Sequence, residues 1–119
     1  MAAIPRIDLE NVDGVWIVRF RERKIYDERM VREVGDQVFA ALPADRSPIR
    51  LIVDFTGVEV ISSSFLGKLI LLLRRVDASN GKMRLCEMNP VVAGVFRTSN
   101  LDRLFGIDRD RRESLEKFK

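Results

Sequence analysis

The feature that most constrains the fold is a strand, a helix and a second strand that follow one another between residues 50 and 88. The apolar run 51–53 is bounded by turn residues and predicts a buried strand. A long amphipathic helix follows from the serines at 62–64 to about Ala78, and residues 82–88 predict the next strand. Such a unit implies parallel pairing of the two strands through a right-handed crossover. The sequence therefore predicts an α/β fold.

The flanking segments extend this pattern on both sides. Asp13-Gly14 is a strong hairpin turn signal, because both residues tolerate a positive φ. Asp27 and Asn89-Pro90 have the chemistry of helix starts. The predicted elements outside the central unit are strands at 7–10, 15–20 and 104–107, and helices at 27–42, 89–99 and in the tail 108–119. The expected order is β-β-α-β-α-β-α-β-α.

This order predicts a mixed sheet of about five strands with about four helices, in which the opening hairpin supplies the antiparallel strand. The chain has 119 residues, enough for one domain to bury a core. It shows no repeat, linker or low-complexity segment. We therefore expect a single domain over residues 1–119, with its core at about 7–107 and a helical tail at 108–119.

The composition excludes several classes of catalytic site. The chain has no histidine, which removes the commonest general base and the usual zinc ligand. It also lacks a nucleophile elbow, a phosphate-binding loop and a dinucleotide fingerprint. Asp54, Glu59 and Asp77 are too scattered to predict a metal site. We expect that the protein is not an enzyme and uses no cofactor or metal.

Charge and hydropathy favour a soluble cytoplasmic protein. The 21 basic and 18 acidic residues are interleaved, whereas a nucleic-acid-binding protein should show a one-sided basic face. No N-terminal segment resembles a signal peptide, and the longest apolar run, 69–73, is too short to cross a bilayer. Cys86 is the only cysteine and lies in a predicted strand, where a small buried apolar residue is the simplest interpretation. We expect neither a nucleic acid nor a membrane as partner.

The three serines at 62–64 stand where the long helix begins. Capping of the helix by one hydroxyl is the simplest interpretation, but a single cap accounts for only one serine. A phosphate here would bring about −1.5 to −2 charges to the positive end of a helix, so the fold should tolerate it. A partner docked over the same helix mouth would meet new negative charge and should leave. The triplet therefore favours a switch that acts on binding.

The run Ile61-Ser62-Ser63-Ser64-Phe65-Leu66-Gly67 resembles the most diagnostic motif of the STAS domain of anti-sigma factor antagonists. Asp54 matches the aspartate that ends the preceding strand in that family. Residues 101–105 resemble the late LxxLF segment of the family, so the resemblance covers roughly residues 7–107. It implies that Ser63 is the phosphoacceptor, supported by the motif residues Asp54, Leu66 and Gly67. The chain departs from the family where Ser62 replaces an aspartate and Phe65 replaces a small residue.

The resemblance implies a bacterial phosphoprotein of signal transduction and transcription regulation. Such a protein binds an anti-sigma factor with serine-kinase activity, which phosphorylates Ser63 and ends the complex. A metal-dependent serine phosphatase would restore the unmodified form. The predicted partner-binding residues are Ser62, Ser64, Phe65, Lys68, Leu71 and Arg75.

Two alternatives stay open at this point. The protein could be a STAS scaffold or sensor subunit that binds protein partners or a small ligand without being phosphorylated, and the departures at Ser62 and Phe65 favour this alternative. For Lys68 and Arg75, a merely solvated helix face is an equally good interpretation, and a lone exposed leucine at Leu71 needs no explanation.

Overall fold

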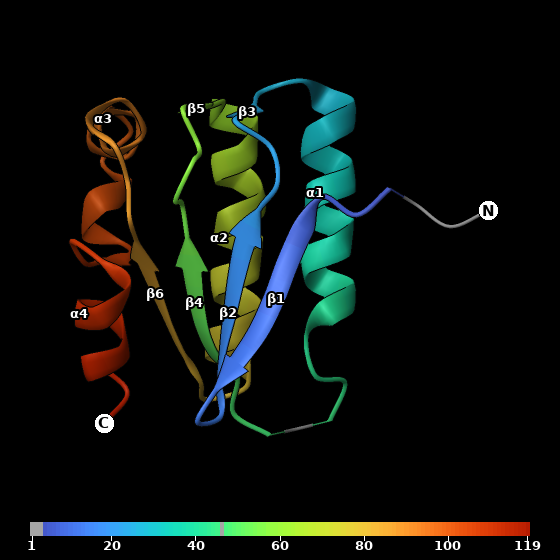
Figure 1. The fold of residues 1–119 in the computed structure, drawn as a ribbon, viewed down its shortest axis with the longest axis vertical. Helices are drawn as coiled ribbons and strands as arrows, with labels where there is room; N and C mark the ends of the chain where they lie inside the picture. The colour runs from blue at the N-terminus through green and yellow to red at the C-terminus, as the bar shows by residue number, and fades with distance from the viewer. Residues whose placement is uncertain (1–3, 46) are drawn as a thin grey trace.

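The computed structural model describes residues 4–45 and 47–119 and has a five-stranded sheet at its centre (Figure 1). The elements in chain order are β1 (Ile7–Val12), β2 (Val15–Phe20), β3 (Lys24–Ile25), α1 (Glu28–Ala41), β4 (Arg50–Asp54), β5 (Val60–Ile61), α2 (Ser63–Ala78), β6 (Lys82–Cys86), α3 (Pro90–Thr98), the 3-10 helix η1 (Leu101–Arg103), β7 (Gly106–Ile107) and α4 (Arg111–Glu116). The predicted α/β class is confirmed.

The sheet is mixed, with the strand order β1-β2-β4-β6-β7. The first two strands form the predicted antiparallel hairpin, in which Val12 pairs with Val15. Its turn residues Asp13 and Gly14 have φ angles of 51° and 86°, as the turn signal required. All the other pairs in this sheet are parallel, including the predicted pair of β4 and β6 across α2.

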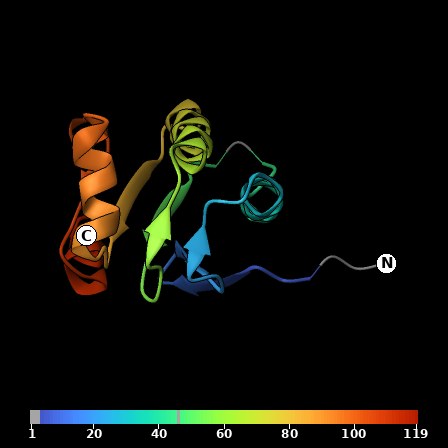
Figure 2. The same cartoon turned by 90° about the horizontal axis from the view of Figure 1, so that it is seen from above.

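Helices cover the sheet on both faces. α1 and α2 lie on one face, and the short helix α4 lies against β4 and β6 on the other (Figure 2). Strand β2 contributes to both cores: Val18 and Phe20 belong to the large cluster under α1 and α2, whereas Val15 and Ile17 belong to the smaller cluster near α4. This explains why β2 is apolar at both odd and even positions.

α2 is amphipathic, as its sequence pattern predicts. It buries one stripe and leaves Leu71 exposed on the other side. The buried stripe consists of Phe65, Leu66, Leu69, Leu72 and Val76. Within residues 4–45 and 47–119, none of the helices combines the length and the apolar character needed to cross a membrane.

The fold differs from the sequence prediction in two places. Residues 21–25 were expected to be only a connection, but Lys24–Ile25 forms β3 and pairs in parallel with the equally short β5. Strand β7 begins at Gly106 and not at residue 104, because the backbone N–H groups of Leu104 and Phe105 both donate to the carbonyl of Leu101 and continue the turn of the 3-10 helix. The two-residue strands β3 and β5 are too short to produce a periodic pattern, so the sequence carries no signal for them.

Candidate functional site

The mouth of α2 is held in place by the small sheet of β3 and β5. The backbone N–H of Ser62 donates to the carbonyl of Ile25 at 3.0 Å, directly after the two strands pair. On the other side, the side-chain amide of Asn89 donates to the carbonyls of Val58 and Glu59, both at 3.2 Å. The loop before the serines is thus fixed between two neighbouring segments, so the helix mouth presents a defined surface (Figure 1, beside the labels β3 and β5).

Ser62 caps α2. Its hydroxyl accepts a hydrogen bond from the N–H of Phe65 at 3.3 Å, and its backbone is extended, as an N-cap residue requires. The hydroxyls of Ser62 and Ser64 lie 2.8 Å apart and share a hydrogen bond. Capping therefore accounts for Ser62, and Ser64 supports it from the first turn.

Ser63 differs from its two neighbours. It is the first residue of α2, and its side chain is exposed. Its hydroxyl has no hydrogen-bond partner among residues 4–45 and 47–119. The first N–H groups of a helix carry partial positive charge, so this position tolerates an attached anion. Of the three serines, Ser63 is the one that the fold leaves available.

The prediction that Phe65 belongs to the partner-binding surface is wrong. Its side chain is only 2% exposed and lies in the core. The ring centroids of Phe20 and Phe55 lie 5.5 and 6.5 Å from that of Phe65. The physical reason is helical periodicity, since position 65 begins the buried stripe of α2. Phe65 therefore fixes the helix mouth on the core.

Lys68 and Arg75 lie on the flank of α2 that faces α1. A Cβ atom added at Gly35 would lie 3.1 Å from Cδ of Lys68, so the lysine stem packs over this glycine. Nη2 of Arg75 donates to the carbonyl of Pro43 at 3.0 Å. Both side chains are half-buried and join α2 to the α1 segment. Neither is simply a solvated residue.

The outward face of α2 carries Ser63, Ser64, Gly67 and Leu71. Leu71 is 49% exposed, and Gly67 is exposed with nothing within 4 Å of the position that a Cβ atom would occupy. Packing within the described chain therefore does not require glycine at this position. We call these four residues the α2 outer face.

Gly67 and Gly81 form a matched pair for a test of packing, because an added Cβ atom would meet no neighbour at Gly67 and would overlap the backbone at Gly81. Gly67→Ala is expected to leave the free energy of unfolding unchanged or raise it by up to about 1 kcal/mol, because alanine is the better helix former. Gly81→Ala should lower it by about 1–3 kcal/mol or more, because the new Cβ would overlap the backbone of Ile49. Urea unfolding of both variants measures the difference, and equal effects would contradict it.

Asp54 has a structural role at the end of β4. Its side chain is almost fully buried, and Oδ1 accepts hydrogen bonds from the N–H and hydroxyl of Thr56 at 2.8 and 2.6 Å. Its other oxygen accepts from Nε of Arg111 at 3.0 Å, and Arg111 also binds Glu10 at 2.7 Å. Arg111 carries no sequence signal for this role, because it lies 57 positions from Asp54. Leu66, the other motif residue, is buried in the core.

An open hollow of about 700 Å³ lies beside the helix mouth. It is lined by charged residues of the segment 21–24, together with Tyr26, Met30 and Glu59. Tyr26 is 57% exposed and directly follows β3, whose last carbonyl accepts the N–H of Ser62. Sequence analysis missed these residues, because a charged segment with one tyrosine gives no motif.

Cys86 is buried, as its sequence context predicts. Burial, with a smaller contribution from the charge of Asp54, raises the pKa of its thiol to about 12. Because the thiolate is the reactive form, folded protein at pH 8 should react with a disulfide reagent at least about a hundredfold more slowly than unfolded protein. Absorbance of the released thiol measures both rates, and similar rates would contradict the buried placement.

The comparisons with known proteins agree with this architecture. The family model for the STAS domain matches residues 6–114. The chain belongs to the STAS domain family. Among curated relatives, this STAS protein is 24% identical over 116 residues to BtrV of Bordetella bronchiseptica, a provisionally assigned anti-sigma factor antagonist. That alignment covers 96% of the chain and 95% of BtrV.

Solved structures share the fold at low sequence identity. An anti-sigma-factor antagonist (STAS) domain protein from Planctomyces limnophilus is 22% identical, with a TM-score of 0.82 and coverage of 93% of this chain and 96% of the other. The Bacillus protein SpoIIAA in its unphosphorylated form is 21% identical, with a TM-score of 0.73 and coverage of 94% and 95%. Both confirm the STAS fold.

Proposed function

We propose that this STAS protein is an anti-sigma factor antagonist that binds an anti-sigma factor with serine-kinase activity in the bacterial cytoplasm. Phosphorylation of Ser63 by that kinase switches the protein off. The observation that carries the proposal is the state of Ser63: it is exposed at the start of α2 and is not used in the cap that Ser62 makes.

Two relatives support the proposal. BtrV is provisionally assigned to the anti-sigma factor antagonists and matches along nearly the whole chain. SpoIIAA, named as an anti-sigma factor antagonist, has been solved in both an unphosphorylated and a phosphorylated form. A STAS fold of this kind therefore accommodates phosphate, and the exposed Ser63 of this chain offers an acceptor.

The proposed docking surface is the α2 outer face with Tyr26 beside it. Leu71 supplies exposed apolar area, and Gly67 lets a partner approach the helix backbone closely. A phosphate on Ser63 would add about −1.5 to −2 charges inside this surface. The positive end of the helix dipole stabilises part of that charge in the free protein. A docked partner, however, must remove water from the phosphate. The complex is therefore lost while the fold stays intact.

Reversal of the switch needs a second protein. We propose that a metal-dependent serine phosphatase removes the phosphate from Ser63 and returns the chain to its binding form. In this scheme the STAS protein is the substrate of both enzymes and needs no cofactor of its own. Lys68 and Arg75 remain candidate contacts only at the edge of the surface, because intrachain partners hold them.

Binding of the kinase encoded in the same genome tests this surface. Leu71→Glu is expected to weaken binding at least about tenfold, since it replaces the exposed apolar side chain of the α2 outer face by a charge. Val91→Glu is a matched control, because Val91 is 58% exposed but lies on α3. Isothermal titration calorimetry without ATP measures both variants. Equal affinity of the two variants would contradict the surface.

A further inference from the structure

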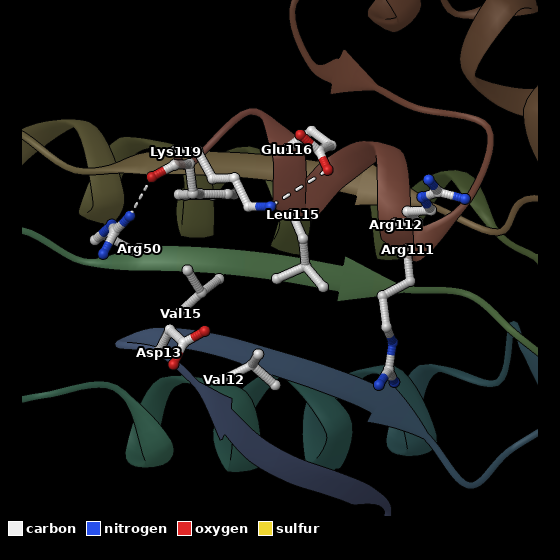
Figure 3. Close-up of a pocket in the computed structure, with 10 residues that line it drawn as sticks. Val12, Asp13, Val15, Arg50, Arg111, Arg112, Leu115, Glu116 and Lys119 are labelled. Atoms are coloured by element: carbon white, nitrogen blue, oxygen red, sulfur yellow. Dashed lines mark hydrogen bonds and ion pairs between the residues drawn. The ribbon is translucent and has the colours of Figure 1, made fainter.

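A second hollow lies on the opposite face of the sheet from α2. It has a volume of about 530 Å³ and lies between the turn end of the β1–β2 hairpin and helix α4 (Figure 3). Its apolar wall consists of Val12, Val15, Leu115 and Phe118. Val12 and Val15 pair across the hairpin, and the side chain of Leu115 points toward them from α4. We call this site the hairpin–α4 hollow.

The hollow exists because α4 is too short to cover the whole sheet. The helix has six residues and lies over β4 and β6. The small core beneath it continues under β2 through Val15 and Ile17, and Val12 packs at its edge. An apolar floor therefore extends beyond the helix toward the hairpin turn. Its volume is within the range of about 300–1,000 Å³ that is typical of small-molecule sites.

The charges around the hollow are mostly basic. Two of the four basic side chains have carboxylate partners: Arg111 binds Asp54 and Glu10, and Lys119 binds Glu116 at 3.4 Å. In the part of the chain that the structure describes, Arg50 and Arg112 have no carboxylate within ion-pair distance. Asp13 is the remaining acidic residue of the lining. Counted over the lining residues alone, four basic side chains face the two acidic ones, Asp13 and Glu116.

Phe118 holds the guanidinium of Arg50 in position at the hollow. Arg50 is half-buried, its Nη2 donates to the carbonyl of Phe118, and its guanidinium lies 5.5 Å from the centroid of the Phe118 ring. A guanidinium has five N–H donors in a planar fork, so donors remain for a carboxylate. Arg112 lies at the other end of the hollow (Figure 3) and adds to its positive potential.

We propose that the hairpin–α4 hollow binds a free long-chain fatty acid or a similar single-chain anionic amphiphile. The carboxylate binds Arg50, and the alkyl chain covers Val12, Val15 and Leu115. A ligand with one carboxylate and one alkyl chain matches a hollow in which Arg50 lies beside a single apolar wall. This site lies on the other face of the sheet from Ser63, so it goes beyond the proposed function and is independent of it.

Titration with cis-parinaric acid, a fluorescent long-chain fatty acid, tests the proposal. The full chain is expected to show saturable binding of one molecule below the micelle concentration. Oleic acid should displace the probe, and oleyl alcohol should do so at least about tenfold less well, because it lacks the carboxylate. Absence of saturable binding, or equal competition by the alcohol, would overturn the proposal.

Five variants localise the site. Val12→Phe fills the apolar wall and Arg50→Gln removes the cation, so each should weaken binding at least about tenfold. Leu9→Phe is the matched control on the same strand, and Arg32→Gln is the matched control for charge on α1. Both controls, and Ser63→Asp, should bind within about twofold of the unmodified protein. Unchanged binding by folded Val12→Phe, or loss in the controls, would overturn the placement.

Two further experiments distinguish a bound fatty acid from other occupants of the hollow. Cosedimentation with phosphatidylglycerol vesicles, without binding of monomeric fatty acid, would show a membrane-surface site and overturn the proposal. Dimerisation that Val12→Phe abolishes, again without fatty-acid binding, would show an interface between copies and overturn it as well. Circular dichroism of each variant establishes that it is folded before its affinity is compared.

Discussion

Replacement of Ser63 by aspartate is expected to weaken binding of the partner kinase at least about tenfold, the equivalent of about 1.4 kcal/mol. The new carboxylate stands at the helix-mouth end of the α2 outer face, where a docked partner must bury it without a prepared counter-charge. The fold should not suffer, because an acidic residue in the first turn of a helix is favourable by about 0.3–1 kcal/mol. Calorimetric binding and urea unfolding separate the two effects.

Two controls define this expectation. Ser47→Asp adds the same charge to an exposed serine in the connection after α1, and its binding should be unchanged. Ser63→Ala removes the acceptor hydroxyl without adding charge, so it should bind the kinase and stay bound when ATP is added. Tight binding by Ser63→Asp, or equal loss in Ser47→Asp, would contradict the placement of the partner at the helix mouth.

The largest effect on stability is expected from Arg84→Ala. The carboxylate of Asp108 is buried, with its side chain 1% exposed, and Arg84 binds both of its oxygens at 2.9 and 2.7 Å. The hydroxyl of Ser114 on α4 donates to the same carboxylate at 2.6 Å. Loss of Arg84 leaves a buried charge without its counter-ion, which costs about 3–5 kcal/mol of unfolding free energy. Urea unfolding at neutral pH measures the loss.

The pH dependence of this effect has a defined sign. The hydrogen bonds from Arg84 lower the pKa of Asp108 below its ordinary value, although burial opposes the shift. Its contribution to stability is therefore present above the unfolded-state pKa of about 3.9 and is lost as the pH falls through the lower folded-state pKa. The difference between the unmodified protein and Arg84→Ala should shrink in that acid range.

A double variant provides the control for Arg84→Ala. Arg84→Met with Asp108→Leu removes both charges and keeps apolar volume, so it should be less destabilised than the single variant. A cost below about 1 kcal/mol for Arg84→Ala, or a double variant that is worse than the single one, would contradict the account of this buried pair.

The parts of the fold that sequence analysis predicted correctly have local signals. Asp13-Gly14 specifies its turn by backbone conformation, and Asn89-Pro90 specifies a helix start by a side-chain cap and a fixed φ. The contacts that it missed join distant positions. Arg84 and Asp108 are 24 residues apart, and no periodic or capping pattern relates them. Local chemistry therefore predicts elements, whereas their non-local ion pairs require the structure.

At the candidate site too, the sequence predicted some features and the structure was needed for others. The motif comparison selected Ser63 from three serines, and the structure adds that Ser62 is the cap. For Phe65, two signals in the sequence conflicted: its place in the motif suggested a partner contact, whereas the apolar stripe of α2 indicated burial. Periodicity reports how a helix packs on a sheet, and in this chain it gives the correct position of Phe65.

The most direct test of the central claim is a map of the phosphate itself. The purified protein and its Ser63→Ala variant are incubated with ATP and the partner kinase, and the products are analysed by mass spectrometry and size-exclusion chromatography. We predict one phosphate, on Ser63, together with release of the kinase, and neither change in Ser63→Ala. An unmodified protein that stays bound to the kinase would contradict the switch and favour a non-phosphorylated STAS scaffold. A phosphate on Ser62 or Ser64 alone would contradict the assignment of Ser63.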